Sequence, residues 1–167
     1  MPLNARGRAQ AAEAGRRLRT LVDDPAGLDY VASPLSRTRD TMEIARAALG
    51  LPIEGYSLDD RLKELTFGAW EGLTWREVRV RDAAGARLRD ADKWGFQPPG
   101  GESYAMLRDR IAPVLAELTR DVVIVSHGGV ARAMLALLTE ASESDAPRID
   151  IWQGRVLVFA DGASRWV

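Results

Sequence analysis

The sequence predicts a single α/β domain, a three-layer α/β/α sandwich built on a mostly parallel sheet. Segments of strand character alternate with segments of helical periodicity along the chain, which is the pattern of such sheets. Residues 121–126 are almost continuously apolar, as expected of a strand covered on both faces. The chain has 167 residues, 46% of them hydrophobic, which suffices for one full-sized core. No repeat or linker interrupts residues 1–167, so we expect one domain.

In the first part of the chain, two helices flank a short strand. Residues 7–21 place alanine and leucine at helical spacing and predict an amphipathic helix. Residues 28–33 are apolar and β-prone, and predict a buried strand that Pro34 closes. A second helix then extends to Gly50, a favourable residue just beyond a helix C-terminus, and residues 52–56 predict a short strand.

The middle of the chain is expected to be irregular. Residues 59–72 show no clear period and predict a loop, whereas Thr74 and Glu77 fit a capping box that starts a short helix. Residues 83–102 are rich in glycine and proline, so they predict an excursion with at most a short helix.

The last part of the chain returns to regular elements. Residues 107–118 have the apolar spacing of a helix, and a further helix follows the strand of residues 121–126, from Gly128 to about residue 138. Residues 156–167 suit a closing hairpin that turns at Asp161-Gly162.

Composition excludes several classes of protein. The formal net charge of −1 gives no field that would attract nucleic acid or an anionic membrane. Cysteine is absent, which excludes disulfides and thiolate sites, and His127 is the only histidine, which excludes metal sites built from several histidines. No apolar run is long enough to span a bilayer, and the N-terminus lacks the apolar segment of a secretory signal, so we expect a cytoplasmic location.

The most informative segment is Ser126-His127-Gly128-Gly129. A buried strand ends there, a histidine follows, and two glycines open a helix. Glycine lets backbone N–H groups approach a ligand closely, and a helix N-terminus favours an anion. Ligands of parallel sheets lie at the carboxyl ends of the strands. On position alone, a phosphate-binding histidine and a histidine that only caps the helix remain equally open.

Two further segments carry candidate site residues. Arg37 follows another buried strand and lies just inside a helix, where its guanidinium could donate to two phosphate oxygens. In a chain so rich in arginine, a solvated surface side chain is the simpler interpretation. Glu64 and Glu71 lie in a loop rich in aromatic residues, which suits a general acid, although solvated carboxylates are again the simpler interpretation.

Together these segments resemble the histidine phosphatase superfamily, the phosphoglycerate-mutase-like enzymes. Three family elements, S-P-L-x-R-x-x-x-T, L-x-E-x-x-x-G-x-W-E-G and the second-histidine element, are matched by SPLSRTRDTMEIA, LKELTFGAWEG and VSHGGVAR. The family's P-L-T-x-x-G-x-x-Q-A helix is matched by PLNARGRAQAAEAGRRL, and the element before its long helix by PPGGES. These five elements occur in the expected order over essentially the whole chain. The resemblance therefore implies a phosphoglycerate-mutase-like fold.

The resemblance also implies a mechanism. In the family, the histidine of an R-H-G motif attacks phosphorus and becomes phosphohistidine, which divides the transfer into two steps. By motif position, Arg37 is the second pocket arginine and His127 the second histidine, and both hold phosphoryl oxygens with help from the Gly128 amide. Glu64 takes the position of the acid/base. The family needs no metal or other cofactor.

The R-H-G motif itself does not occur in the sequence. In the family it lies upstream of the helix that begins here almost at Met1, so we expect the chain to lack the nucleophile and the first central strand, through a late start or a true loss. We place that strand between those of residues 28–33 and 121–126. The two are then expected to pair directly or to borrow a strand from another subunit, which favours a homodimer.

The expected function is hydrolysis of a small-molecule phosphomonoester, although the chain without its nucleophile is expected to be inactive. Phosphoglycerate mutases carry paired arginines after the acid loop, and no such motif is recognisable in residues 74–101. PPGGES also resembles the element of broad-specificity and cobalamin-pathway phosphatases, so we favour a phosphatase over a mutase. The rival interpretation is a non-catalytic protein that binds a phosphorylated ligand.

Overall fold

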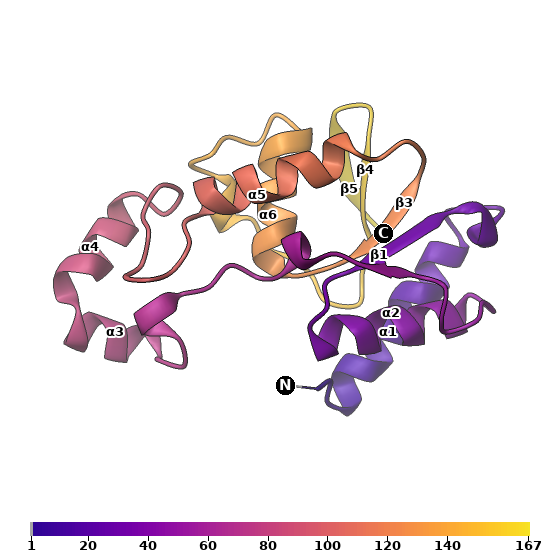
Figure 1. The fold of residues 1–167 in the computed structure, drawn as a ribbon, viewed down its shortest axis with the longest axis horizontal. Helices are drawn as coiled ribbons and strands as arrows, with labels where there is room; N and C mark the ends of the chain where they lie inside the picture. The colour runs from indigo at the N-terminus through magenta and orange to yellow at the C-terminus, as the bar shows by residue number, and fades with distance from the viewer. Residues whose placement is uncertain (1) are drawn as a thin grey trace.

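The computed structural model describes residues 2–167, and in it two pairs of helices cover the two faces of a small parallel sheet (Figure 1). α1 (Ala5–Arg19) and α2 (Ser36–Ala48) pack on one face. α5 (Tyr104–Ala116) and α6 (Gly128–Leu138) pack on the other. The predicted three-layer α/β/α fold is confirmed.

The sheet has the strand order β2-β1-β3, and both pairs of neighbours are parallel. β1 (Asp29–Ala32) lies in the middle, between β2 (Ser57–Leu58) and β3 (Val122–Val125). Ala32 is opposite Leu58 on one side and Val125 on the other, so all three strands end at the same edge of the sheet. The segments that follow β1 and β3 therefore leave the sheet side by side.

The two helices on the first face approach each other closely. Asn4 caps α1 through its side chain, which accepts a hydrogen bond of 2.8 Å from the Gly7 amide. Further along α1, a Cβ added at Gly15 would lie 2.8 Å from the Ala48 Cβ and 2.5 Å from the Ala45 carbonyl oxygen of α2. Glycine at position 15 thus sets the distance between the two helices.

The largest core cluster lies on the second face of the sheet. Leu107 and Ile111 of α5 are fully buried against Val130 and Ala133 of α6, together with Leu62 from the loop that follows β2. Since Leu62 belongs to the segment that carries Glu64, this core also anchors a candidate site residue.

Between the loop that carries Glu64 and α5, residues 68–100 form an excursion with two short α-helices. α3 (Trp75–Arg81) begins with the predicted capping box of Thr74 and Glu77, in which the Thr74 amide donates to the Glu77 carboxylate at 2.8 Å. α4 (Ala83–Ala91) is the short helix allowed for within residues 83–102. Figure 1 shows that α3 and α4 lie away from the sheet.

The excursion has its own small core and closes on itself. Its apolar cluster is centred on the buried side chains of Trp70, Val78 and Ala86. At its base, the Ala69 amide donates to the Pro99 carbonyl at 2.9 Å. Gly68 has a φ of +55°, and any side chain there would collide with the backbone of residues 99–101.

The chain ends in the predicted hairpin. β4 (Leu157–Ala160) and β5 (Ala163–Trp166) are antiparallel, and the two-residue turn between them consists of Asp161 and Gly162. Both turn residues have positive φ, 51° and 74°, as a type I′ hairpin requires.

Of the two alternatives expected for the strands of residues 28–33 and 121–126, the structure shows direct pairing. β1 and β3 pair along their whole length, from Asp29 opposite Val122 to Ala32 opposite Val125. Their backbone groups satisfy each other, so nothing separates them. Within residues 2–167, the sheet is interrupted elsewhere, because β3 pairs only with β1 and the β4–β5 hairpin pairs only with itself.

The predicted second strand lies further along the chain than expected. We predicted a strand at residues 52–56, and the strand lies instead at Ser57–Leu58. The Arg46 guanidinium donates to the carbonyl oxygens of Pro52 and Glu54, at 2.9 and 2.8 Å. These bonds hold residues 52–54 against α2, so the chain reaches the edge of the sheet only afterwards.

Within the part of the chain that the structure describes, no helix is long and apolar enough to cross a membrane. The same residues contain no group of three or more histidine or carboxylate side chains placed to hold a metal ion.

The contact at Gly15 makes a stability prediction. Replacing Gly15 by alanine forces a methyl group against the α2 backbone, so we expect a loss of about 1–3 kcal/mol in the free energy of unfolding, measured by urea denaturation. Gly7→Ala in the same helix is the matched control, since its Cβ would lie nearest the flexible Leu3 side chain, at 3.1 Å, and in ordinary contact with Asn4 Oδ1, at 3.5 Å. We expect that control to leave stability unchanged or raise it by up to about 1 kcal/mol. Equal effects at both positions would contradict close helix packing at Gly15.

Candidate active site

The candidate site lies at the edge where β1 and β3 end. Ser33 continues β1 by donating its amide to the Val125 carbonyl at 3.0 Å, and its side chain is completely buried. His127 lies two residues after the end of β3 and precedes the first turn of α6. Because the two strands are parallel and in register, Ser33 and His127 are brought together although 94 positions separate them.

His127 makes a hydrogen bond with each ring nitrogen. Its Nδ1 lies 3.0 Å from a guanidinium nitrogen of Arg37, and its Nε2 lies 2.8 Å from Ser33 Oγ. A guanidinium can only donate, so Nδ1 is the acceptor and the proton resides on Nε2, which donates to the serine. The imidazole is therefore neutral and held in one tautomer.

The charge state of His127 follows from its surroundings. The side chain is buried, with 8% of the residue exposed. Burial lowers the pKa of His127 to about 4, and the positive charges of Arg37 and Arg110 contribute to the lowering. At neutral pH the site thus presents the cation of Arg37 beside an uncharged histidine.

Arg37 is the second residue of α2 and is half-buried, as a ligand-binding residue requires. Its own backbone carbonyl accepts a hydrogen bond from Thr41 Oγ1 at 2.8 Å, and Thr38 Oγ1 donates to the Ser33 carbonyl at the same distance. These bonds fix the start of α2 beside the end of β1. Arg39, two residues on, lies instead on an exposed cleft, with Tyr56 among its neighbours.

Glu64 reaches the same place from the loop after β2. One carboxylate oxygen accepts a hydrogen bond of 3.1 Å from the Gly129 amide, and the other accepts one of 3.0 Å from the Leu65 amide. A Cβ at Gly129 would collide with the carboxylate, so the glycine is what allows this approach. The Gly128 amide, the first N–H of α6, has no acceptor within residues 2–167 and is available to an anion.

The other candidate carboxylate has a different environment. Glu71 accepts hydrogen bonds from the Phe67 amide at 2.7 Å and from Thr66 Oγ1 at 3.2 Å, and both partners belong to its own exposed loop. The structure thus brings Arg37, His127 and Glu64 together and gives Glu71 a bracing position in the loop.

A group of basic residues lies beside Glu64, and we call Arg89, Lys93 and Arg132 the basic cluster. Lys93 Nζ donates to the Pro147 carbonyl at 2.7 Å, and Arg132 Nε donates to the Ile149 carbonyl at 2.9 Å, so both side chains reach one short turn. The Arg89 guanidinium lies 4.2 Å from the centre of the Trp75 ring.

The basic cluster adjoins the N-terminus of α6. An Arg132 nitrogen lies 3.3 Å from where a Cβ on Gly128 would stand. Burial raises the pKa of the Tyr104 phenol, and the charge of Glu64 adds to this while Arg132 and Arg89 oppose it. Tyr104 therefore lies close to both Glu64 and the basic cluster.

The charges of the basic cluster are poorly compensated. Within the described chain, none of its three members forms an ion pair. Burial lowers the pKa of Lys93, and the neighbouring Arg89, Arg132 and Arg148 lower it further, opposed only by Asp90. Half-buried cations that have carbonyl or aromatic partners and no carboxylate keep an uncompensated charge, which favours an anionic ligand.

Sequence reasoning missed several of these residues. Ser33 was seen only as part of a motif, although its place at the end of a buried strand was a usable signal. Lys93 and Arg132 were not singled out, because nothing in their spacing shows that they meet at the same turn.

The fold is an α/β domain in which a guanidinium, a helix N-terminus and a carboxylate meet at one edge of the sheet. The profile of the Histidine phosphatase superfamily (branch 1) matches residues 1–167. The chain belongs to this superfamily.

Known relatives and solved structures agree with this assignment. The chain is 33% identical over 147 residues to the chicken (Gallus gallus) 6-phosphofructo-2-kinase/fructose-2,6-bisphosphatase, covering 87% of this chain and 29% of that protein. It is 38% identical over 120 residues to glucosyl-3-phosphoglycerate phosphatase of Mycolicibacterium vanbaalenii, covering 65% of this chain and 52% of the relative. The chain thus spans under a third of the first relative and about half of the second.

Among solved structures, the α-ribazole phosphatase from Shigella flexneri superposes with a TM-score of 0.77 at 26% identity, covering 98% of this chain and 81% of that one. A mycobacterial glucosyl-3-phosphoglycerate phosphatase in complex with VO3 gives a TM-score of 0.76 at 29% identity, covering all of this chain and 85% of that one.

The low pKa of His127 predicts how stability depends on pH. The unfolded histidine binds a proton near pH 6.5 and the folded one only near pH 4, so the unfolded state holds more protons between these values. Stability is then complete above about pH 6.5 and falls by on the order of 2–3 kcal/mol as the pH drops to about 4.

Urea denaturation across this range measures that slope, and the Hε1 signal of the single histidine in proton NMR measures its pKa directly. His127→Gln should remove the contribution of this residue to the slope. A titration midpoint near 6.5 in the folded protein would contradict the buried neutral imidazole.

Proposed function

We propose that this chain provides the phosphate pocket and the acid/base of a phosphomonoester phosphatase. In this proposal the guanidinium of Arg37, the imidazole of His127 and the amide of Gly128 hold the phosphoryl oxygens, and Glu64 serves the leaving group. One observation carries the proposal: the Glu64 carboxylate bonds to the Gly129 amide, two residues from the histidine that Arg37 contacts. Anion donors and a proton donor thus share one helix N-terminus.

The proposed chemistry has two steps. A histidine nucleophile attacks phosphorus while protonated Glu64 gives its proton to the departing ester oxygen, which leaves as an alcohol. Glu64, now a carboxylate, then takes a proton from water as the water oxygen attacks the phosphohistidine, which releases phosphate and restores the acid.

His127 is unsuited to be that nucleophile. The Nδ1 lone pair is already engaged by Arg37, and Nε2 carries the proton donated to Ser33. The Arg-His-Gly motif that holds the nucleophile in the family is not in the sequence. We infer that the 167 residues bind a phosphoryl group but form no phosphohistidine on His127.

The same features support one alternative, a binding protein for phosphorylated ligands. Pocket donors without a nucleophile hold an anion without cleaving it. We favour the phosphatase because Glu64 is held beside the donors, where a binding site gains nothing from a carboxylate that repels phosphate.

The basic cluster suggests the class of substrate. A phosphomonoester held at Gly128 would direct its alcohol portion past Glu64, and Arg132 lies beside Gly128. Two of the relatives named above are a fructose-2,6-bisphosphatase and a glucosyl-3-phosphoglycerate phosphatase, and both names indicate a substrate with a second anionic group. We propose that this chain also acts on a phosphomonoester with a second phosphate or a carboxylate.

Phosphate binding and hydrolysis test the function. The Hε1 signal of His127 should shift on addition of inorganic phosphate, and Arg37→Met should weaken the binding by about tenfold or more, since charged hydrogen bonds contribute about 1.5–3 kcal/mol. Arg39→Met is the matched control and should bind normally. p-Nitrophenyl phosphate should be hydrolysed by a fusion that adds an N-terminal apolar strand ending in Arg-His-Gly, and by this chain alone not at all.

Two outcomes decide against this assignment. A phosphoenzyme mapped to His127 in the chain alone would overturn the role given to that residue. A folded fusion that binds phosphate and VO3 but hydrolyses no ester would favour the binding protein.

The substrate class is tested through the two lysines of the chain. Lys93→Gln should weaken the binding of 3-phosphoglycerate about tenfold while leaving that of inorganic phosphate unchanged, because only the former reaches the basic cluster. Lys63→Gln is the control, since Lys63 is exposed and pairs with Asp60 at 2.9 Å. Isothermal titration calorimetry measures both ligands. Equal losses for the two, or none, would exclude a second anion site at Lys93.

A further inference from the structure

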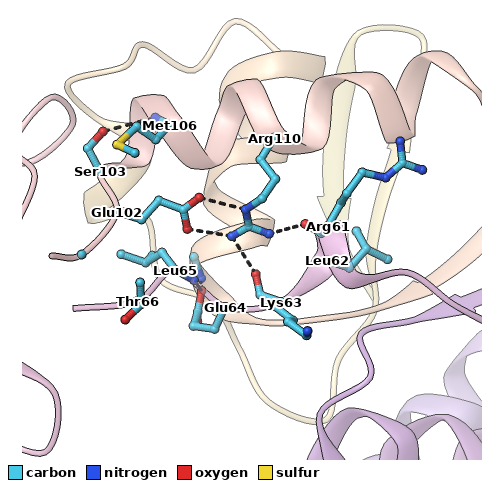
Figure 2. Close-up of polar contacts among 12 residues, drawn as sticks. Arg61, Leu62, Lys63, Glu64, Leu65, Thr66, Glu102, Ser103, Met106 and Arg110 are labelled. Carbon is cyan, nitrogen blue, oxygen red and sulfur yellow. Dashed lines mark hydrogen bonds and ion pairs between the residues drawn. The ribbon is translucent and has the colours of Figure 1, made fainter. Parts of the chain in front are cut away.

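Hydrogen bonds to its backbone carbonyl groups fix the loop that carries Glu64, and one arginine donates most of these bonds. Figure 2 shows the Arg110 guanidinium of α5 facing residues 61–64, with bonds to the carbonyl oxygens of Arg61 and Lys63. The Lys63 bond measures 3.1 Å. Between these two carbonyls, that of Leu62 accepts a bond of 2.7 Å from Ser126 Oγ. Three successive carbonyl groups before Glu64 are therefore fixed.

Arg110 is itself oriented by Glu102. The Glu102 carboxylate accepts two hydrogen bonds from the guanidinium, of 2.8 and 2.7 Å, in the planar forked geometry that only arginine forms (Figure 2). Both side chains are largely buried, with 25% and 14% exposed. The Glu102 amide also donates to the Thr66 carbonyl at 2.9 Å, so the pair holds the loop on both sides of Glu64.

The charge of Arg110 acts on the phosphate pocket as well. Its positive charge contributes to the low pKa of His127, behind burial and Arg37. The charge of the guanidinium is thus close enough to the pocket to influence His127, although Arg110 forms no hydrogen bond to the groups proposed to bind phosphate. It contacts the loop rather than any reacting atom.

The geometry points to Arg110, oriented by Glu102, as a positioning residue that holds the Glu64 carboxylate against the Gly129 amide. Arg110 does not bind phosphate in this assignment; it fixes the backbone from which Glu64 reaches the N-terminus of α6. The role of Glu64 in catalysis rests on the proposed function, whereas its position at Gly129 can be measured without activity.

The Gly129 amide offers the readout. It donates to Glu64, so its ¹⁵N and ¹H chemical shifts should change over a pH series as that carboxylate gains a proton. We call this pH-dependent change the Gly129 step. Glu64→Gln should abolish the step and thereby assign it to Glu64. Arg110→Met keeps the length of the side chain and removes every donor, so most of the step should disappear. Arg110→Lys keeps the charge without the fork, and we expect a reduced step.

Controls separate positioning from simple stabilisation. Arg108→Met alters a half-buried arginine of the same helix that pairs with Asp109 at 2.8 Å and with Glu143, and it should leave the Gly129 step intact. Glu102→Gln releases the fork while keeping Arg110 and should shrink the step. All variants are compared by circular dichroism and thermal unfolding at the same temperature below their transitions.

The outcomes are distinct from those of the proposed function. A full Gly129 step in folded Arg110→Met or Arg110→Lys overturns the positioning role, even if the variants melt earlier. Absence of the step in the unaltered protein also overturns it, because Glu64 is then not at Gly129. Failure to bind phosphate would count against the proposed function alone. In the Arg-His-Gly fusion, Arg110→Lys should slow hydrolysis of alkyl phosphates more than that of p-nitrophenyl phosphate, whose leaving group needs little acid.

Discussion

The candidate site depends on the register of two parallel strands. Because Ala32 lies opposite Val125, the chain leaves both strands at the same level, and Ser33 meets the histidine that follows β3. A slip of one residue would turn every side chain to the other face of the sheet and separate the two. The same register places the start of α2, with Arg37, beside the start of α6. A backbone constraint therefore assembles groups that are distant in the sequence.

The site also shows how charge is distributed around that constraint. Arg37 and Arg110 both lower the pKa of His127, yet only Arg110 has a carboxylate partner, Glu102. Arg110 is neutralised by a carboxylate, whereas Arg37 and the basic cluster form no ion pair within the described residues. Local charge imbalance of this kind reduces stability and is expected where a ligand completes the balance.

Much of this arrangement was predictable, for identifiable reasons. Strand ends and glycines made His127 and Arg37 candidates, and only the family resemblance gave these two residues and Glu64 their expected roles. Direct pairing of β1 with β3 was one of two expected alternatives, and only the structure decides between them, because a family resemblance orders elements along the chain and does not state which strands pair. Lys93 and Arg132 bond to two carbonyl groups of one distant turn, and the spacing of residues in the sequence does not reveal such a contact. The bonds from Arg46 that displace the predicted second strand are likewise not visible in the sequence pattern.

The closure at the base of the excursion has a consequence for how the molecule unfolds. Residues 68–100 leave and re-enter at one point, where Gly68 meets the backbone of residues 99–101, and they bury their own cluster around Trp70. Trp94, near the return of the segment, is buried in the main core and stacks on Tyr104. The part that can open while the sheet and its four covering helices stay folded is therefore α3 and α4. Local opening of these two helices would move Arg89 and Trp75 and leave Glu64 bonded to the Gly129 amide. Under the proposed function, access for the alcohol portion of a ligand and retention of its phosphate would then depend on separate parts of the chain.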